Sequence, residues 1–96
     1  MYNIHMKTVK WNLKKNQTLM ENRGIGLEDV IVAIKEGRLL DTVKHPNQKR
    51  YPNQFIYIIR IQGYLYMVPF VEEADYIFLK TIIPSRKQTK RYQKND

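Results

Sequence analysis

Apolar residues recur along this chain with two different spacings, and each spacing predicts a different kind of element. In most of the chain they come in short alternating runs bounded by Gly, Pro, Asn or acidic residues, which is typical of strands. These runs predict strands over residues 4–11, 39–43, 55–62, 64–71 and 76–83. Gly63 lies between two of the runs and predicts a tight hairpin turn.

Two helices are predicted between the first strand and the second. Asn12 is a favourable N-cap for a helix over residues 13–23, and Gly24 follows where that helix is expected to stop. A second helix is expected between a capping Gly26 and a stop at Gly37. Its apolar residues have the i, i+3, i+4, i+7 spacing of a helix that packs through one face, at Leu27, Val30, Ile31 and Ile34.

The order of these elements predicts an α+β fold. Helices come first and an antiparallel meander follows, giving the order β-α-α-β-β-β-β and a twisted antiparallel sheet with both helices on one face. Residues 44–54 are rich in Pro and Asn, so they predict a loop. We expect one domain over residues 1–96, ending in a basic tail from about residue 84.

Composition narrows the class of protein. The hydrophobic fraction of 43% and the aromatic fraction of 11% favour a folded domain over a disordered chain. No apolar run approaches the roughly 20 residues that span a bilayer, and the polar N-terminus does not resemble a secretory signal. The chain has no cysteine, which excludes disulfides and thiolate chemistry. These observations together predict a cytoplasmic protein without a membrane partner.

Charge points to the partner. The net charge is +8, and residues 86–94 contain five Lys or Arg residues and no acidic residue. Such a field attracts polyanions, of which RNA is the first expectation. An acidic protein partner and a basic surface without functional meaning are the alternatives.

Two segments of the chain resemble the BrnT-type toxins of bacterial type II toxin–antitoxin systems. The segment "WNLKK…RGIGLEDV" matches the start of that family at Trp11, Lys15, Arg23, Gly24, Ile25, Leu27 and Glu28. The segment "FLKTIIPSRKQTKRY" matches its last strand and its ending, at Ser85, Arg86, Lys87 and Thr89. The sequence departs from the family at Asn12, where Asp is common, and at Arg23, where His is common.

The resemblance implies a fold, an activity and a partner. The fold would be similar to that of the RelE-like ribonuclease toxins. The activity would be endoribonuclease cleavage of RNA that inhibits translation and needs neither metal nor cofactor. The partner would be a cognate antitoxin with a ribbon-helix-helix DNA-binding domain, forming a hetero-oligomer in which the antitoxin covers the basic face of the toxin.

RNA cleavage through the 2′-hydroxyl needs a group that accepts its proton, a group that stabilises charge on the phosphate and a group that protonates the leaving oxygen. Arg86 and Lys87 are the first candidates for the phosphate, because a guanidinium binds phosphate in a bidentate way. Lys80 shares a strand face with Phe78 and would enter a cleft formed on that face. The alternatives are a solvated tail for Arg86 and Lys87, and an edge-strand lysine that discourages aggregation for Lys80.

His45 is the candidate general base, because histidine titrates near neutral pH and this one has several cations nearby in the loop. An ordinary loop histidine is the alternative. Arg50 and Tyr51 in the same loop are candidates for phosphate binding and base stacking, with turn packing as the alternative for Tyr51. Further RNA-binding candidates are Lys14, Lys15, Lys90 and Arg91.

No metal site is predicted, because the two histidines lie forty residues apart and no cysteine is present. Two other classes of function remain open beside the toxin. One is a non-catalytic nucleic-acid-binding module that uses the same basic cluster. The other is an interaction protein for an acidic partner. Replacement of Arg86 would separate the first two classes, since a nuclease should lose cutting far more than binding.

Overall fold

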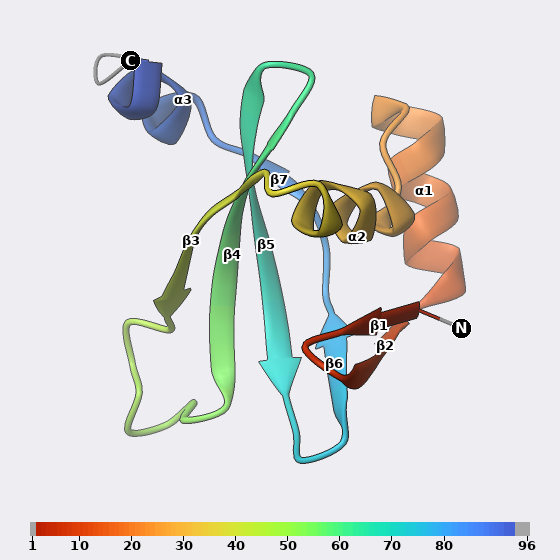
Figure 1. The fold of residues 1–96 in the computed structure, drawn as a ribbon, viewed down its shortest axis with the longest axis vertical. Helices are drawn as coiled ribbons and strands as arrows, with labels where there is room; N and C mark the ends of the chain where they lie inside the picture. The colour runs from red at the N-terminus through yellow and green to blue at the C-terminus, as the bar shows by residue number, and fades with distance from the viewer. Residues whose placement is uncertain (1, 94–96) are drawn as a thin grey trace.

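Residues 2–93, which the computed structural model describes, form an α+β fold around one curled sheet (Figure 1). The strands are β1 (Tyr2–Ile4), β2 (Lys7–Trp11), β3 (Leu39–Lys44), β4 (Gln54–Ile61), β5 (Tyr64–Glu72), β6 (Tyr76–Leu79) and β7 (Ile83–Pro84). The helices are α1 (Leu13–Arg23), α2 (Leu27–Lys35) and α3 (Arg86–Gln93). The α+β class and the two N-terminal helices are as predicted.

The sheet is mixed, so the predicted all-antiparallel sheet is wrong. Its strand order is β1-β2-β6-β5-β4-β3, with β7 paired to β5, and β2 runs parallel to β6. The chain leaves β2 through both helices and three strands before it returns beside β2 as β6. A connection of that length allows a parallel pair, whereas a tight turn allows only an antiparallel one. The β4–β5 hairpin has the predicted tight turn, at Gln62 and Gly63.

The opening segment forms a hairpin of two strands where one strand was predicted. The chain reverses at His5 and Met6, which both have positive φ (55° and 69°). Two-residue hairpin turns of type I′ require positive φ at both central residues. The reversal buries Ile4 and Val9 in the core and leaves Met6 almost fully exposed. Alternation alone did not reveal this turn, because neither turn residue is Gly, Asn or Asp.

The last predicted strand is interrupted. Phe70 pairs with Leu79 in β6, whereas Met67 pairs with Ile83 in β7, so one extra residue lies on the β6–β7 side. An extra residue of this kind is a bulge, and it reverses which face the following side chains occupy. Ile82 therefore enters the core and Ile83 is exposed, whereas the uninterrupted strand predicted over residues 76–83 would place Ile82 on the face of Phe78.

The segment predicted as a basic tail forms α3. Its residues are adequate helix formers, and the Ser85 carbonyl accepts the first helical hydrogen bond from the Thr89 amide at 3.0 Å. The Thr89 hydroxyl also accepts a hydrogen bond from the Leu65 amide at 3.0 Å, which attaches the helix to β5. Side chains, and not the backbone pattern alone, therefore decide where this segment lies.

The core lies between α2 and one face of the sheet. Buried residues of α2 pack against alternate residues of β4 and β5, including Tyr57, Ile59, Val68 and Phe70. Helix α1 contributes only Leu19 to the core, while its Lys14 and Thr18 border the opposite face near Phe78. The prediction that both helices cover one face is therefore wrong for α1, whose apolar stripe is too narrow to bury it there.

The junction of the two helices fixes the direction of α1. Asn16 of α1 accepts a hydrogen bond from the Leu27 amide at 2.6 Å and so caps α2 from the neighbouring helix. A Cβ atom at Gly26 would lie 2.7 Å from the sulfur of Met20, so glycine permits this close approach. Within residues 2–93, none of the helices has the length and apolar character needed to cross a membrane.

Candidate nucleic-acid interface

An open groove lies between the start of α1 and the end of β6. Its volume is about 630 Å³, and it is lined by Asn12, Lys14, Lys15, Thr18, Phe78 and Lys80. The two sides of the groove are at least sixty residues apart in sequence, and the parallel pairing of β2 with β6 brings them together. The groove therefore combines three ammonium groups, two neutral polar side chains and one aromatic ring.

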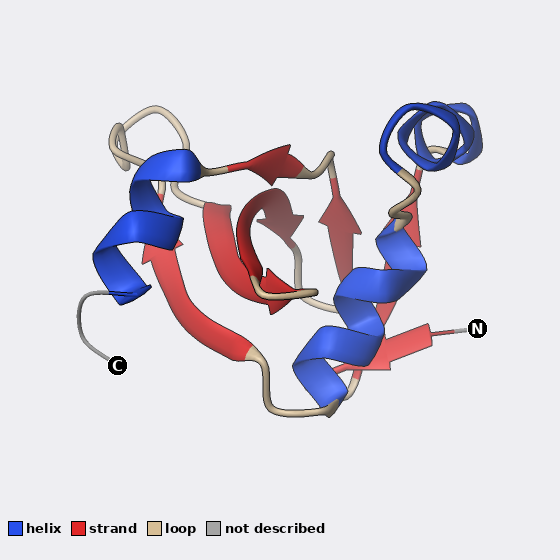
Figure 2. Cartoon of the chain, turned by 90° about the horizontal axis from the view of Figure 1, so that it is seen from above, coloured by secondary structure: helices blue, strands red, loops and turns tan. Residues whose placement is uncertain are grey.

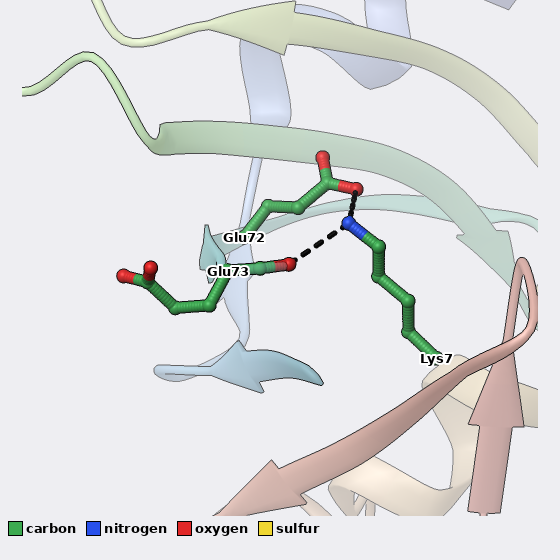
Figure 3. Close-up of polar contacts among 3 residues, drawn as sticks. All are labelled: Lys7, Glu72 and Glu73. Carbon is green, nitrogen blue, oxygen red and sulfur yellow. Dashed lines mark hydrogen bonds and ion pairs between the residues drawn. The ribbon is translucent and has the colours of Figure 1, made fainter. Parts of the chain in front are cut away.

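The three lysines of the groove form no salt bridge with a carboxylate among residues 2–93. Among the described residues, the salt bridges join Lys7 to Glu72 and Arg38 to Glu36, and both lie outside the groove. In the first of these, the Lys7 ammonium is 2.8 Å from a carboxylate oxygen of Glu72 and donates to the Glu73 carbonyl at 2.8 Å (Figure 3). The acidic turn after β5 is thereby held by β2, and the groove keeps its full charge for a ligand.

The start of α1 concentrates this charge. Asn12 caps the helix as predicted, because its side chain accepts a hydrogen bond from the Lys15 amide at 2.9 Å. Lys14 and Lys15 lie in the first turn, which contains no acidic residue. Cations are unfavourable there because the helix dipole is positive at its N-terminus. The arrangement lowers helix stability slightly and raises the affinity of the groove for anions.

Lys80 is held in the groove by two contacts. Its amide donates to the Pro69 carbonyl at 2.9 Å, and its ammonium donates to the side-chain oxygen of Gln54 at 3.0 Å. Gln54 begins β4 directly after the long loop, and its backbone carbonyl accepts from the His45 amide at 3.0 Å. Gln54 is a neutral partner that orients the Lys80 ammonium toward the groove.

The loop candidates stack on one another outside the groove lining. The rings of His45 and Tyr51 have centroids 4.6 Å apart, and the Arg50 guanidinium lies 5.4 Å from the Tyr51 ring centre. The Nδ1 atom of His45 accepts a hydrogen bond from the Asn47 amide at 3.0 Å. This bond requires the proton of a neutral imidazole to be on Nε2, so the acceptor nitrogen is already occupied. The side chain of His45 makes both of these contacts within its own loop.

Helix α3 carries the remaining candidates, and it lies far from the groove. Arg86, Lys87 and Lys90 are exposed. Figures 1 and 2 both place α3 and α1 on opposite sides of the molecule. The side chain of Arg91 lies outside the described part of the structure. The structure therefore groups Lys80 with Lys14 and Lys15, and separates all three from Arg86 and Lys87.

Sequence reasoning missed Gln54, Asn12 and Thr18 as parts of this site. The sequence predicted Asn12 only as a helix cap. Its side chain also lines the groove, because capping holds it against the Lys15 amide at the start of α1. The only sequence feature that marks Gln54 is its position as a polar residue between the loop and the apolar run of the next strand. Its contact with Lys80 joins residues 26 positions apart, which no local pattern reveals.

The described residues contain no group of three His, Asp or Glu side chains placed to hold a metal ion. No protein-family model and no curated protein matches the chain. The site must therefore be interpreted from its own chemistry and from the resemblance of its two segments.

Proposed function

We propose that this chain is a bacterial toxin of the BrnT and RelE-like kind that acts on RNA in the cytoplasm as a metal-independent endoribonuclease. The single observation that carries the proposal is the groove between α1 and β6, where Lys14, Lys15 and Lys80 meet and the described carboxylates form no salt bridge with them. Phosphodiester groups suit three ammonium groups, and an exposed base can stack on Phe78.

The residues of the groove have distinct parts in this proposal. Lys14 and Lys15 bind phosphates of the strand as point charges. Lys80, oriented by Gln54, lies against the phosphate at which the 2′-hydroxyl attacks. The hydroxyl gives its proton to water as its oxygen bonds to phosphorus, and the departing 5′ oxygen takes a proton from water. As the negative charge on that phosphate increases, the Lys80 ammonium stabilises it. Asn12 and Thr18 offer neutral hydrogen-bonding groups for ribose hydroxyls.

Binding and cleavage of a labelled single-stranded RNA of about 20 nucleotides, in buffer with EDTA, test the proposal. We expect Lys80→Ala to reduce the cleavage rate at saturating protein by roughly a hundredfold or more, as for loss of a transition-state donor. Lys14→Ala/Lys15→Ala should weaken binding and lower the salt dependence, the slope of log K against log salt, by about 1.4 for two phosphate contacts on a single strand.

Lys35→Ala is the matched control, because Lys35 is an exposed lysine on α2 away from the groove. It should leave both binding and cleavage unchanged. Equal losses for Lys35→Ala and Lys80→Ala would contradict the groove as the site. Absence of RNA binding by the unaltered chain would contradict the proposal as a whole.

A non-catalytic RNA-binding module is the second candidate, and one observation favours it. The groove lining contains neither a histidine nor a carboxylate to accept the proton of the 2′-hydroxyl. RNA binding that depends on Lys14 and Lys15, with no cleavage under any condition, would decide for this candidate.

The resemblance also suggests a neutralising antitoxin, and the net charge of +8 fits an acidic contact segment on that partner. Growth arrest with RNA breakdown on induction of the chain, relieved by coexpression of the antitoxin, would support this part of the proposal. Normal growth with intact RNA would contradict it.

A further inference from the structure

The face of the sheet opposite α2 is apolar and only partly covered. Strand registers place apolar residues of β3, β4, β5, β6 and β7 on this face, including Val43, Ile56, Met67, Pro69, Phe78 and Ile83. Ile83 is 43% exposed and the others are half-buried. Helix α3 covers the end of the face at Leu65 and α1 borders it at Phe78, so the area between them is open to a partner.

Charges surround this open face unevenly. Lys80 and the exposed Arg86 lie at the two ends of the segment that contains β7, and Lys10 lies beside Tyr76 with its ammonium 4.5 Å from the ring centre. Asp41 lies on the same face at the β3 side, where it pairs with Ile58. A partner should therefore be acidic toward β6, β7 and α3, and neutral or basic toward β3.

The dimensions of the face suit a single helix. Four neighbouring strands spaced about 4.8 Å apart span about 15 Å, and the five residues from Met67 to Val71 span roughly 13 Å along β5. A helix with its side chains is about 10 Å wide, and ten residues of helix are about 15 Å long. Two to three turns of helix would cover the apolar residues and reach the cations at their border.

We propose that this open face binds an amphipathic acidic helix of another protein, with the apolar stripe of the helix on Ile56, Met67 and Ile83. The inference rests on the partner in the proposed function and adds its docking surface and its orientation. Phe78 belongs both to this face and to the groove, so a helix bound here also obstructs RNA.

Two other occupants fit less well. A second copy of the chain carries the same net charge of +8, so two copies brought face to face would repel one another. RNA would find phosphate-binding groups only at the border, since Ile56, Met67 and Pro69 in the interior of the face offer no hydrogen-bond donors to a phosphate. The apolar stripe of an acidic helix would contact the interior of the face, and its carboxylates would contact the cations at the border.

A designed peptide of about 15 residues, with Leu at i, i+3, i+4 and i+7 positions and Glu elsewhere, tests the inference. Its binding to the full chain is measured by calorimetry, beside a scrambled peptide of the same composition. We expect the striped peptide to bind at least about tenfold more tightly than the scrambled one. Amide chemical shifts of the unaltered chain should change on β4, β5 and β7, a readout that needs no variant.

Ile83→Ser should weaken the striped peptide at least about tenfold, whereas Val32→Ser should not. Val32 is the matched control, because it is 45% exposed on α2. No binding at about 1 mM peptide, equal binding of both peptides, or shift changes confined to α2 would overturn the inference. So would Ile83-dependent binding to phosphatidylserine vesicles or Ile83-dependent dimerisation in place of peptide binding. The RNA assays with Lys14, Lys15 and Lys80 variants are separate, so either proposal can fail alone.

Discussion

At the scale of single residues, Tyr57 shows how burial changes a titratable group. Its side chain is 2% exposed and stacks on Phe70 with ring centroids 4.0 Å apart. Burial, and to a lesser degree the negative charge of Glu72, raise the pKa of Tyr57 to about 12 from an ordinary 10.0. The phenol therefore stays neutral in the folded chain at pH values where an unfolded chain would begin to ionise it.

This shift predicts a loss of stability in alkali. Because the folded pKa is raised, the contribution of Tyr57 is complete below pH 10 and is lost as the pH rises toward 12. The full difference is of the order of 3 kcal/mol in the free energy of unfolding. Urea unfolding between pH 9 and pH 12 should show a shallower decline for Tyr57→Phe than for the unaltered chain. Parallel declines would contradict the assignment, since all other tyrosines and lysines are common to both proteins.

At the scale of elements, α3 depends on the hydroxyl of Thr89. This buried group accepts from the Leu65 amide at 3.0 Å and donates to the Ser85 carbonyl at 2.8 Å. The Ser85 amide donates to the Leu65 carbonyl at 3.0 Å. The amide and the carbonyl of Leu65 in β5 are therefore both bonded to residues at the start of the helix. A helix this rich in cations has little apolar surface of its own, and these bonds decide its position.

Thr89→Val should therefore release α3 while leaving side-chain volume nearly unchanged. An unsatisfied Leu65 amide costs about 1–3 kcal/mol, and that amount should be lost from the free energy of unfolding. Thr89→Ser keeps the hydroxyl and is the control, with a smaller expected loss. Hydrogen exchange at the Leu65 amide should accelerate in Thr89→Val only. Unchanged exchange in that variant would show that α3 is held by other contacts.

At the scale of the whole molecule, two groups of cations in the described part of the chain lie apart from one another. One is in the groove at α1 and β6, and the other is on the exposed surface of α3 with Arg86, Lys87 and Lys90. Figure 2 shows the two helices at opposite sides of the molecule. A short RNA bound in the groove would not reach α3, whereas a longer strand would touch both regions.

This separation predicts different effects for the two regions. Arg86→Ala/Lys87→Ala should weaken binding of a long RNA and lower its salt slope by about 1.4, because two phosphate contacts are lost. Cleavage at saturating protein should stay the same, as should binding of a short RNA that fills only the groove. Loss of cleavage at saturation would move the catalytic site to α3 and contradict its placement at Lys80.

Much of the local structure was accessible from the sequence. The Asn12 cap, the Gly24 stop and the apolar spacing of α2 predicted both N-terminal helices, and alternation predicted β3, β4 and β5 to within one residue at each end. These features depend on neighbours a few positions apart, which is the range over which capping, periodicity and turn preferences act. For the same reason, the sequence was enough to predict the charge of the C-terminal segment and the location of Lys80 and Phe78 on one face of their strand.

The tertiary structure alone decided which of these residues meet. The reversal at His5 and Met6, the bulge before Ile83 and the parallel pairing of β2 with β6 all depend on contacts between distant segments. Those contacts brought Lys14 and Lys15 to Lys80, and the docking of α3 carried Arg86 and Lys87 away from them. The sequence by itself determined the elements and their charges, because these depend on local chemistry. Their assembly into a groove and an open apolar face depended on long-range packing, which requires contacts between segments far apart in the sequence.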